Sequence, residues 1–113
     1  MGIDLELHSA RPVRKDWRRS RVTLLASSHA YGEVLAEALT TLRLSGVPGR
    51  LTALDPYRDT LMNEQEAEAA LREIDGLKDA CGSDRRRDAL DELAALLRAC
   101  AATPGSYLWF VAD

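Results

Sequence analysis

The strongest constraint on the fold is a pair of strand-like stretches at the two ends of the chain. Near the start, Ile3, Leu5 and Leu7 alternate with polar residues, which is the period-two pattern of a half-buried strand. Near the end, residues 107–111 form an unbroken apolar and aromatic run, typical of a central strand buried on both faces. We therefore expect the two terminal strands to pair with each other and to hold both ends of the chain.

Helical periodicity dominates the sequence between these strands. Apolar residues recur at helical spacing in residues 30–44, in residues 64–82 and most clearly in residues 84–102. Ser27 or Ser28 is a plausible N-cap for the first helix, and Asn63 or Thr60 for the second. The predicted fold class is α+β, with three to four helices packed on a small sheet that includes both terminal strands.

Two short segments are harder to assign from the sequence. Residues 22–26 fit either a buried strand or the first turns of a helix, because a short apolar run has no diagnostic period. Residues 51–54 are predicted to form a short extended piece. His8 falls on the polar side of the first strand, so we expect a solvated imidazole there.

Length and composition indicate one domain, residues 1–113, because 113 residues with 46% hydrophobic and 29% charged residues are typical of a folded globular chain. The net charge of −3 is too small to imply a charged partner. The first residues lack the pattern of a signal peptide, and no apolar run approaches the roughly 20 residues of a membrane span. The sequence thus predicts a cytoplasmic protein in which Cys81 and Cys100 stay reduced.

The most concentrated polar chemistry lies in residues 55–66, a turn that leads into a helix. Asp55 and Asp59 favour side-chain hydrogen bonds within turns, and Pro56 holds the residue before it extended. A purely structural role is one interpretation: Asp55 closes a turn, Asn63 caps a helix and Tyr57 packs on the sheet. The other interpretation is a partner-binding surface, which would consist of Asp55, Tyr57, Asp59, Asn63, Glu64 and Glu68.

Two segments carry a resemblance to known sequences. Residues 55–63 contain a D-P-Y-x-D-T-x-x-N pattern, and residues 107–113 form an aromatic strand with a final Asp. Both resemble short uncharacterised bacterial proteins, with Arg58 standing where that pattern has glycine. The resemblance implies a site at the turn and no particular reaction.

The sequence is compatible with four functions. A small protein-binding domain of accessory, adaptor or immunity type, without catalytic activity or cofactor, fits best, because acidic helix faces can meet a basic partner. A nucleic-acid-associated protein would use the basic segment 11–21, in which charges surround an aromatic ring. A small enzyme would use Asp55 and Asp59 as acid and base. A calcium loop is disfavoured, because Thr60 stands where an EF-hand needs glycine. The nucleic-acid residues would be Arg14, Lys15, Trp17, Arg18 and Arg19.

The partner is therefore expected to be another protein, with nucleic acid less favoured and no membrane contact. A homodimer is a further option, because a short exposed strand edge invites pairing. No metal site is predicted, since the two cysteines lack a Cys-x-x-Cys spacing.

Overall fold

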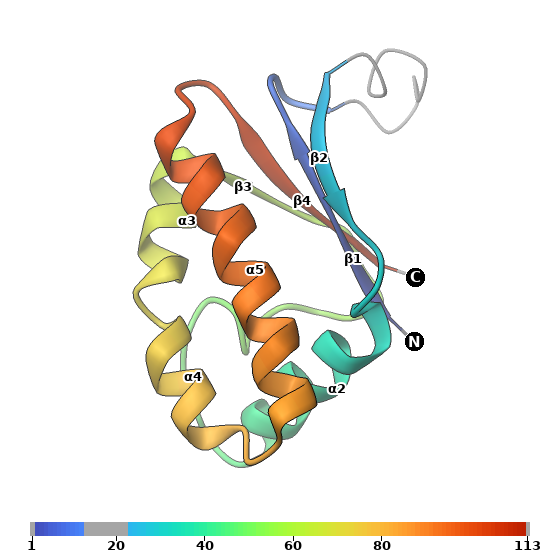
Figure 1. The fold of residues 1–113 in the computed structure, drawn as a ribbon, viewed down its shortest axis with the longest axis vertical. Coiled ribbons are helices and arrows are strands. Elements are labelled where there is room, and N and C mark those ends of the chain that lie inside the picture. Colours follow the sequence, from blue (N-terminus) through green and yellow to red (C-terminus); the bar gives the residue numbers. More distant parts are fainter. Residues whose placement is uncertain (1, 13–22, 113) are drawn as a thin grey trace.

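The computed structural model describes residues 2–12 and 23–112. Within them, four helices pack on one side of a four-stranded sheet, as Figure 1 shows, so the predicted α+β class is confirmed. The elements in chain order are β1 (Ile3–His8), β2 (Leu24–Ser28), α2 (Gly32–Leu44), β3 (Thr60–Asn63), α3 (Glu64–Leu71), α4 (Ile74–Ala80), α5 (Asp84–Ala102) and β4 (Tyr107–Ala112).

The sheet is antiparallel throughout and has the order β2-β1-β4-β3. The terminal strands β1 and β4 are its two central strands, and they pair from Ile3 opposite Ala112 to His8 opposite Tyr107. The predicted pairing of the terminal strands is confirmed. The undecided segment before residue 28 is strand β2, which lies at one edge of the sheet, and β3 lies at the other edge.

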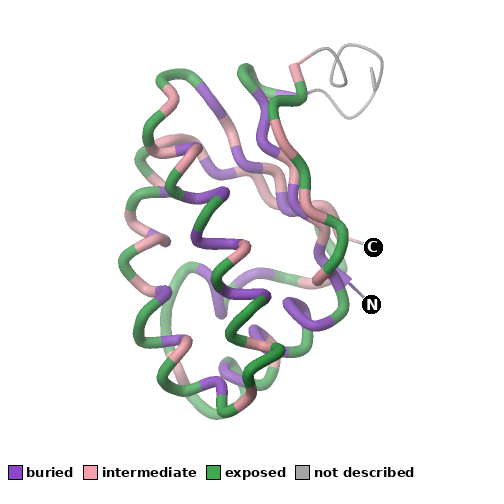
Figure 2. Tube along the Cα trace, viewed as in Figure 1, coloured by how far each residue is buried: buried purple, intermediate pink, exposed green. Residues whose placement is uncertain are grey.

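A single apolar core fills the space between the helices and the sheet. Alternate residues of the central strands, among them Leu5, Leu108 and Phe110, are at most 4% exposed and face the helical layer. Helix α5 crosses this layer and contacts β1, β4 and the other three helices. Figure 2 shows that the buried positions lie on the sides of the helices and strands that face this core.

Strand β4 differs from its prediction in one respect. It is central, but it is buried on one face only, because Tyr107, Trp109 and Val111 are half-exposed on the opposite face. The described helices all cover the same face, and no helix or strand of residues 2–12 and 23–112 covers the other face of the sheet. We call this uncovered side the outer face.

The start of α2 also differs from its prediction. Ser27 and Ser28 lie in β2, and the N-cap is Tyr31, which makes no capping side-chain hydrogen bond. Ser27 and Ser28 pair with Glu6 and Leu5 in the sheet, so they lie too early in the chain to cap the helix. The helix also approaches β1 closely. A Cβ atom on Gly32 would lie 2.6 Å from a carboxylate oxygen of Asp4, so only glycine fits there without a shift.

The predicted helix over residues 64–82 is two helices, and the predicted extended piece at residues 51–54 is a turn. Two hydrogen bonds connect the two segments. The break between α3 and α4 leaves Glu73 outside both helices, and its carboxylate accepts the backbone N–H groups of Arg50 and Leu51 at 3.1 and 3.2 Å. The carboxylate thereby holds the loop that leads to the polar turn.

Helix α5 begins and ends as predicted. Ser83 is its N-cap and accepts the backbone N–H of Arg86, and the helix ends at Ala102, before Pro104 and Gly105. Both cysteines are buried and free, and Cys100 packs in the core of α5. In the part of the chain that the structure describes, none of the helices has the length and apolar composition needed to cross a bilayer.

Candidate functional site

Strand β3 offers free backbone groups at the edge of the sheet. The N–H of Asn63 points away from β4, because it donates to Glu66 Oε1 at 3.2 Å. Backbone groups alternate in direction along a strand, so the N–H and C=O of Leu61 point the same way, and those of Thr60 and Met62 face β4. Leu61 therefore presents one donor and one acceptor at the open edge.

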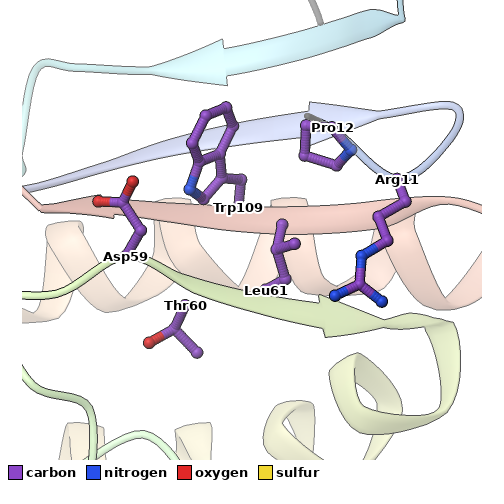
Figure 3. A pocket seen from close by; sticks show the side chains of 6 residues that line it. All are labelled: Arg11, Pro12, Asp59, Thr60, Leu61 and Trp109. Atoms are coloured by element: carbon purple, nitrogen blue, oxygen red, sulfur yellow. The ribbon is translucent and has the colours of Figure 1, made fainter. Parts of the chain in front are cut away.

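A hollow of about 450 Å³ lies on the outer face beside this strand. Figure 3 shows Trp109 and Leu61 projecting into it from β4 and β3, with the helices behind the sheet. Arg11 and Pro12 close it from the segment after β1, and Asp59 and Thr60 complete its lining. We call this cavity the outer hollow.

A second hollow, of about 370 Å³, runs along the free edge of β3. One wall is β3 itself, together with Glu66 of α3, and the other is the loop of residues 50–58, including Arg50, Leu54 and Arg58. We call it the edge groove. Because Asp59, Thr60 and Leu61 line both hollows, β3 separates the two.

The polar turn is held by its own hydrogen bonds. Asp55 Oδ1 accepts the backbone N–H of Tyr57 at 2.9 Å, and its backbone carbonyl accepts that of Arg58 at 3.1 Å. The predicted turn role of Asp55 is thus confirmed. The predicted packing of Tyr57 on the sheet is wrong, because the turn directs the phenol outward and leaves this residue 77% exposed.

Asp59 extends the sheet by one hydrogen bond. Its Oδ1 accepts the backbone N–H of Ala112 at 2.8 Å, at the end of β4 where β3 has no further backbone partner. The side chain thus replaces a strand carbonyl. This bond accounts for the position of Asp59 at the mouth of both hollows.

The remaining predicted site residues serve helix α3. Asn63 is its N-cap as predicted, and its side chain accepts the N–H of Glu66 at 2.8 Å within a capping box. Glu64 accepts the N–H of Gly105 at 3.3 Å, and Glu68 pairs with Arg72 at 3.4 Å on the helix surface. Only Asp55 and Asp59 of the predicted set line the edge groove, so the six residues do not converge on one cavity.

Two of the arginines around β3, Arg50 and Arg58, were not predicted as site residues, and the third, Arg11, was predicted only as part of the basic segment 11–21. Arg50 lies 3.7 Å from Glu66, and Arg58 lies 3.8 Å from Asp55, both beyond hydrogen-bonding distance. Within the described part of the chain, Arg11 has no ion-pair partner. Trp109 was missed as well, although its alternation with Leu108 and Phe110 already assigns it to the opposite face of the strand.

The prediction of a solvated His8 is wrong. The residue is 1% exposed, and its ring nitrogens lie 2.8 Å from Thr23 Oγ1 and 3.0 Å from Glu6 Oε1. Its ring contacts that of Trp109, with 5.7 Å between the ring centres. The imidazole therefore forms a buried polar anchor between β1 and the outer hollow.

Other candidate chemistry is sparse in residues 2–12 and 23–112. They contain no cluster of three or more His, Cys, Asp or Glu side chains arranged to hold a metal ion. Burial raises the pKa of the Cys100 thiol, which packs against Ser106 in the core and faces no cavity described above. The predicted nucleic-acid residues Arg14, Lys15, Trp17, Arg18 and Arg19 lie outside the described residues.

Comparison of the chain with protein-family models, curated proteins and solved structures finds no match. The resemblance of residues 55–63 and 107–113 to uncharacterised bacterial proteins stays a prediction.

Proposed function

We propose that this protein is a small protein-binding domain, of accessory, adaptor or immunity type and without catalytic activity. The observation that carries the proposal is Tyr57, which is 77% exposed at the tip of a turn that Asp55 holds rigid. Tyrosine is enriched at protein interfaces, because it offers a large amphipathic contact area with few rotatable bonds. A rigid turn also reduces the entropy that binding would cost.

The predicted surface can now be divided by role. Asp55, Asp59 and Asn63 each accept a main-chain N–H group, so they shape the turn and the strand behind it. Glu64 accepts an N–H from the loop before β4, and Glu68 extends the surface along α3. In this proposal the aromatic tip and the edge groove contact the partner, and the acidic side chains position them.

The enzyme alternative receives less support from the same contacts. A general acid or base needs a carboxylate directed at a reacting atom. Asp55 Oδ1 and Asp59 Oδ1 each accept a backbone N–H instead, and both residues line an open groove. A structural role accounts for both of these contacts.

The nucleic-acid alternative is favoured by one observation, the presence of Arg11 and Trp109 in the same hollow. A guanidinium group beside an indole ring could hold a phosphate next to a stacked base. Such binding would weaken steeply with salt. A titration of a fluorescent single-stranded oligonucleotide at low ionic strength tests it, and absence of binding there would eliminate this alternative.

A homodimer is an alternative partner choice. Leu24 and Leu25 are 39% and 53% exposed on the edge strand β2, which carries no charged residue to block pairing. We place the protein in the cytoplasm, where the two buried thiols would stay reduced. Sedimentation measured over a range of concentrations distinguishes a monomer from a dimer.

Tyr57→Ala tests the proposed function directly. Affinity capture from a bacterial lysate should recover a partner with the wild-type protein and lose most of it with the variant. Its melting temperature should stay unchanged, because the ring contributes little burial. Leu44→Ala is the matched control, since Leu44 is 83% exposed at the end of α2 and should leave capture intact. Equal capture by wild type and both variants would contradict the proposed surface.

A further inference from the structure

We infer that the partner of this surface is an acidic, extended peptide segment that adds a fifth strand to the sheet along β3. The inference rests on the proposed protein-binding function and specifies its chemistry. Its basis is the combination of a free backbone edge, a cavity on each side of that edge and an excess of available positive charge around it.

The backbone of β3 determines the shape of the partner. Leu61 directs its N–H and C=O into the edge groove, and no side chain of the described residues is seen to bond them. Only an extended main chain presents a matching acceptor and donor at the spacing of a neighbouring strand. A helix keeps its own backbone groups bonded, so it cannot satisfy this edge.

The two cavities account for alternate side chains of such a segment. Neighbouring residues of a strand point to opposite faces of the sheet. One side chain would therefore enter the outer hollow beside Trp109, and the next would enter the edge groove against Leu54 and Met62. Backbone bonds would supply affinity, and these two cavities would supply specificity.

The charges around β3 favour an acidic segment. The carboxylates of Asp55, Asp59 and Glu66 already accept main-chain N–H groups of the protein. The guanidinium groups make weaker contacts: Arg50 and Arg58 form only long ion pairs, and their side chains are 52% and 84% exposed. Arg11 adds a third positive charge at the outer hollow. Guanidinium groups bind carboxylates in a planar, bidentate geometry, so Asp or Glu side chains suit both cavities.

Selection from a random library of linear phage-displayed peptides on the full chain is the first test. We expect the bound peptides to carry Asp or Glu at alternating positions. A selected peptide, synthesised with a fluorescent label, then gives a dissociation constant by anisotropy. Two N-methylated versions of this peptide are then compared, one modified at the odd-numbered residues and one at the even-numbered residues. One version should bind about tenfold more weakly and the other almost normally, because only one set of alternate N–H groups points toward β3.

Variants of the protein locate the segment on the molecule. Leu61→Pro removes the N–H group at the free edge, where proline is tolerated, and should weaken binding about tenfold. Leu61→Val keeps that group and is the control for folding and for the side chain. Arg11→Gln should weaken binding several-fold and reduce its salt dependence, whereas Arg98→Gln, an exposed arginine on α5, should not.

The outcomes separate this inference from the function on which it rests. A peptide insensitive to N-methylation in both registers and to Leu61→Pro would overturn strand addition, even if Tyr57→Ala still abolishes capture of a protein partner. Selection of basic peptides would overturn the acidic segment. Displacement of the peptide by a single-stranded oligonucleotide would assign the outer hollow to a phosphate ligand and would also overturn it.

Discussion

The two faces of the sheet are formed by the same strands but differ in how their side chains are buried. On the inner face, Leu108 and Phe110 are at most 1% exposed and pack against α5. On the outer face, the intervening Trp109 is half-exposed, and the buried His8 makes two polar contacts. One face is covered by apolar packing, and the other is organised by hydrogen bonds around open hollows.

This difference indicates that the inner face contributes mainly to stability and that the outer face is available for binding. Burial of apolar area stabilises the fold in proportion to the area removed from water, and the inner face supplies most of that area. The outer face and the β3 edge contribute less burial, which leaves their side chains free to meet a ligand. Substitutions on the two faces should therefore separate folding from binding.

Phe110→Ala should have a larger effect on stability than any outer-face substitution. Truncation of a fully buried aromatic side chain costs about 3–5 kcal/mol, since it leaves a cavity in the core. Trp109→Ala, one residue away on the opposite face, should cost clearly less because the indole is already partly in water. Urea denaturation followed by circular dichroism measures both free energies of unfolding.

For peptide binding, the same two substitutions should rank in the opposite order. Trp109→Ala should weaken peptide binding several-fold, whereas Phe110→Ala should weaken it only through loss of folded protein. Equal destabilisation by both substitutions would mean that the outer face is covered as tightly as the inner one.

The elements that form the inner face were largely predictable, because most of the sequence patterns that indicate them repeat along the chain. Period-two alternation in residues 3–7 and helical periodicity in residues 84–102 each recur several times, so a single exception does not mislead. The central strand β4 was recognised from a different signal, the unbroken apolar and aromatic run of residues 107–111. Its second face was predicted wrongly, because an apolar run alone does not reveal whether a second layer of structure exists.

The outer face and the site were predictable only in part, because they depend on contacts between distant residues. The local bonds of Asp55 and Asn63 span two and three residues, and the sequence pattern contains them. The bond from Ala112 to Asp59 spans 53 residues and those from the loop to Glu73 span 22 and 23, so no local pattern indicates them.

His8→Ala should destabilise the protein by roughly 2 kcal/mol, an intermediate effect. The change deletes two polar contacts and leaves a gap beneath Trp109, although Glu6 is partly exposed and can bind water in compensation. His29→Ala is the matched control. That histidine is 57% exposed and lies 3.2 Å from Asp4, so its loss should cost at most about 1 kcal/mol. Equal costs for both changes would show that the outer face contains no buried anchor.

The pH dependence of stability should show the smallest effect, and it arises on the inner side. Burial raises the pKa of the Cys100 thiol, and its hydrogen bond with Ser106 offsets this only in part. The unfolded chain therefore releases this proton at lower pH than the folded protein does. The contribution is fully present below the unfolded pKa of about 8.5 and is lost as pH rises through the higher folded pKa, by at most about 1.4 kcal/mol per pH unit.

Cys100→Ala isolates this contribution. The difference in unfolding free energy between wild type and variant should be constant from pH 6 to about pH 8 and should then shift in favour of the variant. The variant still contains the other titrating groups, so their effects cancel in the difference. A difference that stays flat up to about pH 10 would mean that water reaches this thiol in the folded protein, and that the inner face is less completely sealed than its burial indicates.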